Sequence, residues 1–180
     1  LEFVMPLQLL KRLMPRRAAT FGRTVVSDDL LDRVKDALPK LQGWCSPEKA
    51  TLLVKYIREE HIDLCVELGV FGGSSLVPQL MALQANGTGH AHGIDPWSVD
   101  AALENMLGQP NRDWWSSVNL EAVYQQLVNY LAMNGLTKYC TLHREKSENA
   151  AGKFKDGSIG LLHIDGNHSE PQSFTDAKLY

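Results

Sequence analysis

The sequence has little of what marks secreted, membrane-spanning or nucleic-acid-binding proteins. Its three cysteines are odd in number and widely spaced, so we expect buried thiols in the reducing cytoplasm and no disulfide framework. No run of about 18 apolar residues occurs, which argues against a membrane-spanning helix. The net charge of −3 gives no electrostatic reason to expect a nucleic-acid partner. A composition of 44% hydrophobic and 22% charged residues over 180 positions is that of one globular domain with a proper core.

Two familiar phosphate-binding fingerprints are also missing, although residues 62–75 contain a glycine-rich turn. The apolar run 64–68 breaks into three glycines, and a helix-like segment, 76–83, follows at once. The spacing is neither Gly-x-Gly-x-x-Gly nor Gly-x4-Gly-Lys-Ser/Thr. A buried strand, a tight turn and a helix N-terminus nevertheless let backbone N–H groups approach a ligand.

The residues of this turn read Glu67-x-Gly69-x-Phe71-x-Gly73-x-Ser75. The pattern resembles the first motif of class I S-adenosylmethionine-dependent methyltransferases, especially the catechol-type O-methyltransferases. The resemblance implies that this turn binds the methionine part of S-adenosylmethionine. By the same resemblance, Glu67 and Gly69 border the amino-acid moiety and Ser75 bonds its carboxylate, a charge that the helix dipole also favours.

We divide the chain into an N-terminal helical segment, residues 1–45, and a cofactor-binding domain, residues 46–180. Residues 5–17 have the pattern of a basic amphipathic helix, which can bind a membrane surface. The segment is short and contains Pro6 and Pro15, so we expect it to pack against the domain or a second subunit instead. Residues 29–41 are a plausible helix. Ser46 and Pro47 open another helix, with serine as its cap and proline in its first turn.

A second strand, residues 90–94, ends at Asp95-Pro96-Trp97. An acid at this strand end, 20 to 30 residues after a glycine turn, is placed to bond ribose hydroxyls. A turn or capping aspartate is the alternative. Paired with the glycine turn, Asp95 favours ribose binding, and Trp97 is a candidate to cover the adenine face.

Residues 100–115 look irregular, and we interpret them as an insertion or lid near the cofactor. Residues 120–131 form an amphipathic helix that ends at an Asn-Gly pair, and residues 139–143 form the third strand. Ser147 follows and can cap the next helix. In catechol-type enzymes a serine after this strand contacts the adenine, so the resemblance makes Ser147 a cofactor-binding candidate.

The fourth strand, residues 159–164, runs into Asp165, Gly166, Asn167 and His168. Strand carboxyl ends share one edge of a parallel sheet, so Asp165 and His168 should face the same crevice as Gly69 and Asp95. The run Leu-His-Ile-Asp-Gly-Asn-His-Ser resembles bacterial macrocin-type O-methyltransferases, in which the corresponding aspartate binds Mg²⁺. It implies a magnesium ligand at Asp165 that fixes and activates a substrate hydroxyl. His168 has the pKa range of a general base, with a turn cap as the alternative.

The other five histidines are better interpreted as structural, because their spacing matches no zinc site. They are His61, His90, His92, His143 and His163.

Alternating strands and helices predict an α/β fold: a Rossmann-like parallel sheet with helices on both faces. The family that the chain resembles has seven strands, whereas this sequence ends in the helix after the fourth. We therefore expect a fragment or a shortened homologue, with sheet edges that a second copy of the chain could cover.

The function we expect is S-adenosylmethionine-dependent O-methylation of a small molecule such as a sugar, a phenol or a natural product, with Mg²⁺ as a candidate cofactor. Two alternatives stay open. One is a metal-dependent hydroxylase of the cephalosporin hydroxylase type, which resembles the same fold. The other is a non-catalytic cofactor-binding module.

Overall fold

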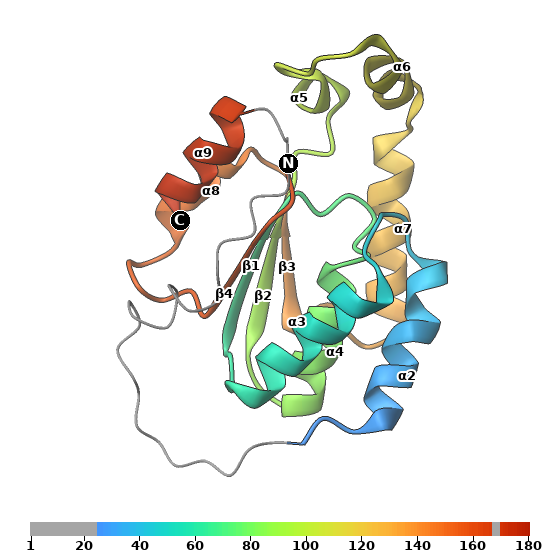
Figure 1. Cartoon of the computed structure of the whole chain (residues 1–180), viewed down its shortest axis with the longest axis vertical. Coiled ribbons are helices and arrows are strands. Elements are labelled where there is room, and N and C mark those ends of the chain that lie inside the picture. Colours follow the sequence, from blue (N-terminus) through green and yellow to red (C-terminus); the bar gives the residue numbers. More distant parts are fainter. Residues whose placement is uncertain (1–24, 167–169) are drawn as a thin grey trace.

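The computed structural model describes residues 25–166 and 170–180 of the chain. A parallel sheet of four strands lies at its centre, in the order β3-β2-β1-β4 (Figure 1). The strands are β1 (Leu64–Leu68), β2 (His90–Ile94), β3 (Cys140–His143) and β4 (Leu161–Ile164). This arrangement confirms the predicted Rossmann-like α/β fold, and β3 and β4 form the edges of the sheet.

Helices connect the strands in the alternation that the sequence predicts. The α-helices are α2 (Asp28–Ala37), α3 (Pro47–Glu59), α4 (Leu76–Asn86), α5 (Val99–Leu103), α6 (Gln109–Ser117), α7 (Leu120–Met133), α8 (Ser147–Ala150) and α9 (Glu170–Leu179). Three short 3-10 turns, η1 (Leu38–Lys40), η2 (Thr137–Tyr139) and η3 (Ala151–Lys153), complete the elements of the described residues. In Figure 1, α2, α3, α4 and α7 lie on one side of the sheet, and α8 and α9 lie on the other.

Successive side chains of β1 point to opposite faces of the sheet and therefore belong to two hydrophobic cores. Cys65 joins the larger core, which includes Leu30 and Val34 of α2 as well as residues of α3, α4 and α7. Val66 and Leu68 point to the other face, into a smaller core with Ile94. Helices therefore cover both faces of the sheet, and the chain before residue 46 contributes to the same core as the domain.

Serine caps start α2 and α3. The Ser27 hydroxyl accepts a hydrogen bond from the Leu30 backbone N–H, and that of Ser46 accepts one from the Lys49 N–H. Pro47 occupies the first turn of α3, where its missing N–H costs nothing. The predicted start of α3 is thereby confirmed.

The prediction that residues 100–115 are irregular is wrong. They contain most of α5 and most of α6, two short helices separated by residues 104–108. The Ser98 hydroxyl caps α5 through the Ala101 N–H, and Pro110 lies in the first turn of α6. Local capping thus makes helices in a segment with no clear apolar period. The predicted helix at 5–17 lies outside the described residues.

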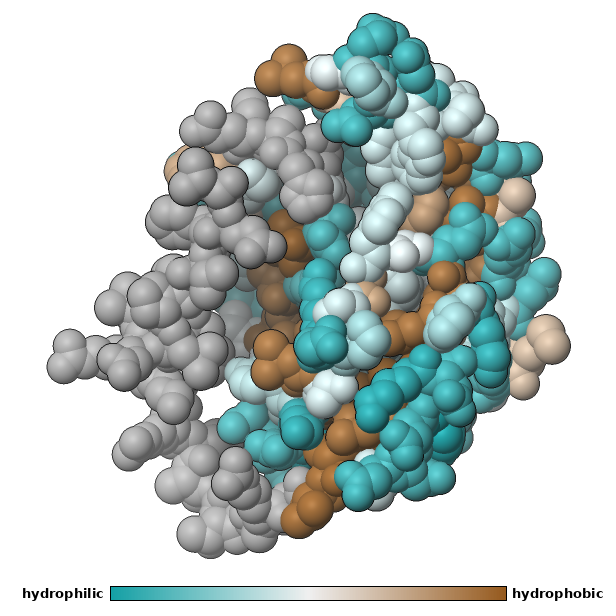
Figure 2. Space-filling model, turned by 45° about the vertical axis from the view of Figure 1, so that its right-hand side comes forward, coloured by the Kyte–Doolittle hydropathy of each residue, from teal (hydrophilic) through white to brown (hydrophobic). Residues whose placement is uncertain are grey.

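The described surface is mostly polar on the face that Figure 2 presents, with apolar side chains in narrower strips. Among the described residues, no helix is long and apolar enough to cross a membrane.

Candidate functional site

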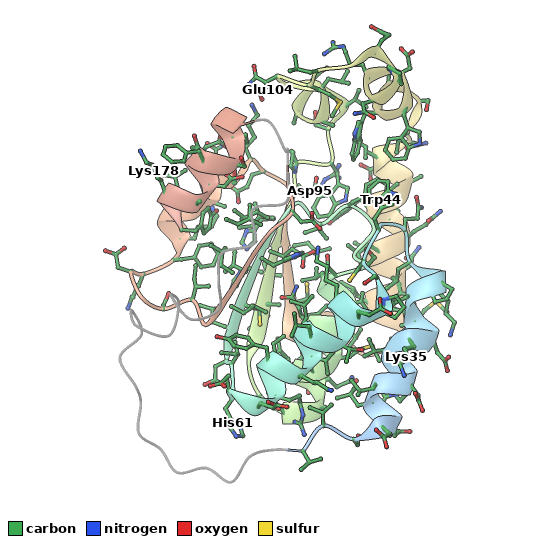
Figure 3. The ribbon with its side chains drawn as sticks, viewed as in Figure 1. Lys35, Trp44, His61, Asp95, Glu104 and Lys178 are labelled. Carbon is green, nitrogen blue, oxygen red and sulfur yellow. The ribbon has the colours of Figure 1, made fainter. Side chains whose placement is uncertain are left out.

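A cavity of about 1080 Å³ opens at the carboxyl ends of the strands. Its lining comes from the segments that follow all four strands, from α5 and from the start of α3. Figure 3 shows Asp95 at this end of the molecule, with Trp44 and Glu104 beside the same region and His61 at the opposite end. Parallel α/β sheets bind ligands at this edge. The volume is ample for a small-molecule ligand.

The turn after β1 has the backbone that its glycines predict. Gly69 has a φ of +81°, and a Cβ there would lie 2.3 Å from the Asp165 carbonyl oxygen. Gly73 also has a φ of +81°, and its Cβ would meet Leu127. Glycine is required at both positions, because a side chain would be strained and would clash.

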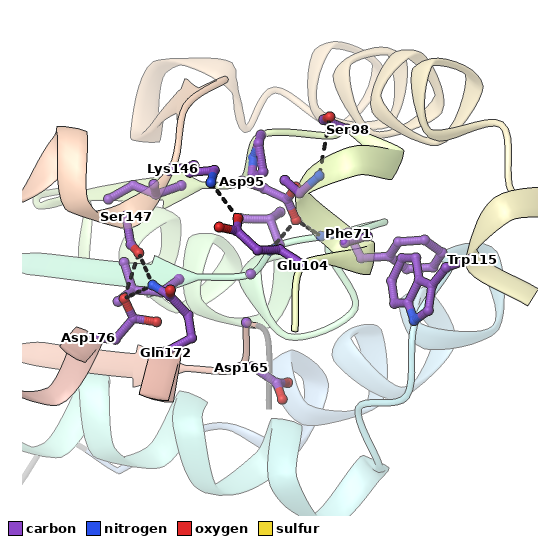
Figure 4. Close-up of a pocket in the computed structure, with 18 of the residues that line it drawn as sticks. Phe71, Asp95, Ser98, Glu104, Trp115, Lys146, Ser147, Asp165, Gln172 and Asp176 are labelled. Atoms are coloured by element: carbon purple, nitrogen blue, oxygen red, sulfur yellow. Dashed lines mark hydrogen bonds and ion pairs between the residues drawn. The ribbon is translucent and has the colours of Figure 1, made fainter. Parts of the chain in front are cut away.

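Asp95 ties the turn after β2 to the turn after β1. Its Oδ2 accepts hydrogen bonds from the backbone N–H groups of Val70 (3.0 Å) and Phe71 (2.9 Å), and its Oδ1 accepts one from Trp97 (2.7 Å). Burial raises the pKa of the Asp95 carboxyl, and the three backbone hydrogen bonds oppose that rise. Asp95 lines the cavity (Figure 4). Both oxygens of Asp95 already accept hydrogen bonds from backbone N–H groups. The predicted contact of Asp95 with ribose therefore stays a prediction.

Trp97 lies behind this turn. Its side chain is buried, and its indole Nε1–H donates to the Phe71 carbonyl oxygen at 2.9 Å. Tyr124 packs against the ring edge. Trp97 is outside the cavity lining, so its predicted position over an adenine gains no support.

Glu67 is fully buried beneath the turn and accepts three hydrogen bonds. The Ser75 hydroxyl donates to it at 2.9 Å, the Gln79 amide donates to it, and His163 Nδ1 lies 3.0 Å from its Oε2. Because the carboxylate only accepts, the Nδ1 of His163 is the donor when Glu67 is ionised. Glu67 supports the turn from behind and does not line the cavity, whereas Ser75 does.

Asp165 pairs with a lysine that sequence reasoning missed. The Lys49 ammonium lies 3.1 Å from Asp165 Oδ2, and both side chains line the cavity. His163 Nε2 lies 3.9 Å from the same oxygen. The result is a row of groups from buried Glu67 through His163 and Asp165 to Lys49. His168, the predicted second catalytic residue, lies outside the described residues.

Ser147 begins α8 but makes no side-chain capping bond, so the capping interpretation is wrong. Its hydroxyl donates instead to Asp176 Oδ1 of α9, at 2.5 Å. The Gln172 amide donates to the same oxygen at 3.2 Å (Figure 4). Ser147, Gln172 and Asp176 all line the cavity, and the Asp176 side chain is buried.

An aromatic wall of Trp44, Phe71 and Trp115 lines another part of the cavity. The Trp44 ring stacks on Phe71 with centroids 5.3 Å apart and planes 19° apart. Trp115 meets Phe71 edge-on at 5.6 Å. Trp44 is 71% exposed, and Trp114 also meets its ring edge-on, with centroids 5.5 Å apart. The spacing of these three aromatics in the sequence gave no signal of their meeting.

The donor set of the cavity fits S-adenosylmethionine, an amphiphilic ligand with a charged end and an aromatic base. The start of α4 at Ser74 and Ser75 supplies polar groups and the positive end of the helix dipole for the amino-acid end. Leu68 and Ile94 contribute apolar lining. The cluster around Ser147 supplies polar groups for a base.

The same residues do not fit a magnesium ion. Among the described residues, no group of three or more His, Cys, Asp and Glu side chains could hold a metal. Asp165 Oδ2 contacts a lysine ammonium, which competes with a divalent cation for the same oxygen. The predicted Mg²⁺ at Asp165 therefore finds no support in the described part of the chain.

The fold of this chain is similar to that of solved methyltransferase structures. The fold resembles that of TomG, an O-methyltransferase from Streptomyces achromogenes involved in tomaymycin synthesis and solved with SAM, with a TM-score of 0.52 and 19% identity. This likeness covers 86% of this chain and 62% of TomG, so the chain spans less than two thirds of that protein's length.

Two further solved structures match at TM-scores below 0.5. One is a putative O-methyltransferase from Klebsiella pneumoniae, with a TM-score of 0.47 and 17% identity over 88% of this chain and 57% of that one. The other is cofactor-bound Rv0187 from MTB, with a TM-score of 0.48 and 14% identity over 85% of this chain and 61% of that one. No curated protein matches the chain significantly.

The fold and the cavity define a Rossmann-like α/β protein with a ligand site at its strand ends. A family model described as "Methyltransferase domain" matches residues 66–180, which is more than half of the chain. The chain belongs to this methyltransferase domain family.

Proposed function

We propose that this protein transfers a methyl group from S-adenosylmethionine to an oxygen atom of a small molecule that carries an aromatic ring. The observation that carries the proposal is one cavity that brings together the glycine turn after β1, Asp95 and Asp165 in a chain of the methyltransferase domain family.

The turn after β1 supports cofactor binding. When bound, S-adenosylmethionine supplies an electrophilic methyl group on its sulfonium. Gly69 lets the turn pack directly against the backbone of Asp165, and Gly69, Phe71 and Ser75 line the same space. Asp95 orients the turn through its backbone bonds, and Ser147 offers a polar contact for the base.

Asp165 and Lys49 act on the acceptor. The Asp165 carboxylate at the end of β4 is placed to take the proton of an acceptor hydroxyl. The Lys49 ammonium, 3.1 Å from Asp165 Oδ2, would stabilise the negative charge that develops on an acceptor oxygen beside the pair. With S-adenosylmethionine bound, the acceptor oxygen would bond to the methyl carbon as the sulfur–carbon bond breaks, and its proton would go to Asp165. Holding both reactants in one cavity is the larger contribution, because it makes the reaction effectively unimolecular.

The aromatic wall narrows the acceptor among the candidates that the sequence leaves open. Trp44, Phe71 and Trp115 present stacking and edge surfaces for a planar ring. A phenol or an aromatic natural product fits this wall better than a sugar. The hydroxylase alternative requires an iron site, and the described residues hold no group of ligands for one.

We further propose that the protein works in the cytoplasm, a reducing compartment in which the free thiols of Cys45, Cys65 and Cys140 stay reduced. Burial raises the pKa of Cys65 and of Cys140 to about 12.

Titration calorimetry with S-adenosylhomocysteine tests the cofactor site. We expect micromolar binding by the wild type and none by Ala101→Trp, which places a bulky ring in the cavity lining. Ala132→Trp is the matched control, because Ala132 is exposed on α7. Absence of heat with wild-type protein that is folded by circular dichroism would overturn the proposal.

Methyl transfer itself is tested by incubation with S-adenosylmethionine and paired panels of phenols and sugars, with the methylated products identified by mass spectrometry. Products from phenols support the aromatic acceptor. Products from sugars alone would contradict it.

A further inference from the structure

Lys49 lies where helix stability alone does not favour a cation. It belongs to the first turn of α3, a helix of 13 residues, and its backbone N–H is one of the capped donors of that turn. The helix dipole is unfavourable to positive charge at this end. Glu48, its neighbour, is the kind of residue that this position favours. The reason for a lysine here must therefore lie in what its side chain contacts.

The side chain reaches across to the carboxyl end of β4. Its ammonium lies 3.1 Å from Asp165 Oδ2, and both partners are partly exposed to the cavity, at 40% and 37%. A half-exposed ion pair contributes little to stability. Its position in the cavity makes it a feature of the site, not of the core.

His163 approaches the same carboxylate from the sheet. Its Nδ1 is engaged with buried Glu67, and its Nε2 lies 3.9 Å from Asp165 Oδ2. His163 is thus the more distant neighbour of this oxygen, and the Lys49 ammonium at 3.1 Å is the positive group in contact with it. No described group of three or more His, Cys, Asp and Glu side chains surrounds this position.

We propose that the Lys49 ammonium takes the place of a divalent cation beside Asp165. The pair forms a metal-free, charge-neutral site in which Lys49 supplies the positive charge. The consequence for methyl transfer, which rests on the proposed function, is that the acceptor oxygen is held between an ammonium donor and a carboxylate, without a metal bridge. Lys49 is thereby a binding residue that the sequence motif does not contain.

Titration with Mn²⁺ tests this assignment, because the electron paramagnetic resonance signal of the free ion falls as the ion binds. We expect wild-type protein to leave the signal unchanged at millimolar Mn²⁺. Lys49→Glu, which would put two carboxylates side by side, should bind Mn²⁺ at least tenfold more tightly, and adding Asp165→Asn should abolish that gain.

Lys55→Glu is the matched control, because it makes the same charge change at an exposed position of the same helix. It should bind no more Mn²⁺ than the wild type. Lys49→Gln removes the positive charge without adding a carboxylate, so it should show a smaller gain in Mn²⁺ affinity. It replaces Lys49→Glu as the test variant if that protein does not fold.

Two results would overturn the proposal. Mn²⁺ binding by the wild type that Asp165→Asn abolishes would show that a metal occupies the site with Lys49 in place. Failure of both Lys49 variants to gain Mn²⁺ affinity would show that Lys49 is not what occupies the metal position. S-adenosylhomocysteine calorimetry on the same proteins keeps the two proposals apart: its failure would refute the cofactor site and leave the Mn²⁺ result standing.

Discussion

The Asp95 carboxylate holds Phe71 in a left-handed backbone conformation. Asp95 Oδ2 accepts the Phe71 backbone N–H at 2.9 Å, and Phe71 has a φ of +48°. Trp97, bonded to the other oxygen of Asp95, has a φ of +43°. Such conformations cost about 1 kcal/mol or more for residues with a Cβ and persist only where surrounding contacts impose them. One carboxylate therefore shapes two adjacent turns of the cavity.

Replacing Asp95 with alanine should destabilise the protein by roughly 3 kcal/mol, since three backbone donors lose their acceptor in a buried place. Asp95→Asn keeps one acceptor oxygen and should cost less. Urea unfolding monitored by circular dichroism measures both. Asp156→Ala, in an exposed turn, is the control and should change stability by less than about 0.5 kcal/mol. Equal stability of Asp95→Ala and wild type would refute the bracing role.

The positive φ of Phe71 predicts that glycine is a more stable replacement than alanine at this position, the reverse of the usual order. Phe71→Gly should be more stable than Phe71→Ala by about 1 kcal/mol, because only glycine adopts a positive φ without cost. Phe154 has an ordinary φ of −108°, and there alanine should be the more stable replacement. Chemical denaturation of the four variants decides the matter, and the same order at both positions would contradict the argument.

Glu67 is expected to act through folding. Glu67→Leu removes the acceptor of Ser75, Gln79 and His163 in a place without water, which should cost about 3 kcal/mol or more. Glu60→Leu, at an exposed position after α3, is the control and should be close to neutral. Thermal melts of both variants measure the difference. A Glu67→Leu variant as stable as the wild type would show that the buried network is dispensable.

Ser147 and Asp176 should act on cofactor binding as one unit. The Ser147 hydroxyl lies 2.5 Å from Asp176 Oδ1 and 3.3 Å from Glu148 Oε2, and Asp176 is the nearer acceptor of its proton. The Ser147 oxygen accepts the Gln172 amide at 3.4 Å, which leaves one lone pair for an amino group of the base. Ser147→Ala and Asp176→Ala should each weaken S-adenosylhomocysteine binding about tenfold, roughly 1.4 kcal/mol, and the double variant should be no weaker than either. Calorimetry of this cycle, with Asp176→Asn as the variant that retains an acceptor, measures the coupling. Additive losses would show that the two residues act separately.

Patterns local in the sequence predicted much of this molecule. The apolar run that ends in glycines predicted β1 and the turn after it. The structure shows why Gly69 is needed there, because a Cβ would clash with the backbone of Asp165. The parallel sheet gave the shared edge of Gly69, Asp95 and Asp165. Capping at Ser46 gave the start of α3. Each of these follows from backbone geometry within a few residues or from the rule that strand ends meet at one edge.

Pairings between distant side chains were not predictable in this way. Lys49 and Asp165 are 116 positions apart, and Glu67 and His163 are 96 apart. Which partner a buried carboxylate finds is decided by how α3 and β4 pack on β1, and no period in the sequence encodes it. For the same reason Glu67, placed by the motif at the cofactor, lies beneath the turn and holds Ser75.

His92 gives the chain a dependence on pH that the sequence does not show. Burial, together with the neighbouring His90 and His143, lowers the pKa of His92 to about 4. In the unfolded chain the histidine has an ordinary pKa of about 6.5. Between about pH 4 and pH 6.5, His92 is therefore protonated in the unfolded chain and neutral in the folded protein. The stability due to neutral His92 is present above about pH 6.5 and is lost as the pH falls toward 4. His92→Gln keeps a hydrogen-bonding side chain toward His143 but cannot titrate, so it should lose about 1 kcal/mol less than the wild type between pH 7 and pH 5, after allowance for solvent screening. Urea unfolding of both proteins at the two pH values measures this difference, and parallel losses in the two proteins would show that His92 does not cause it.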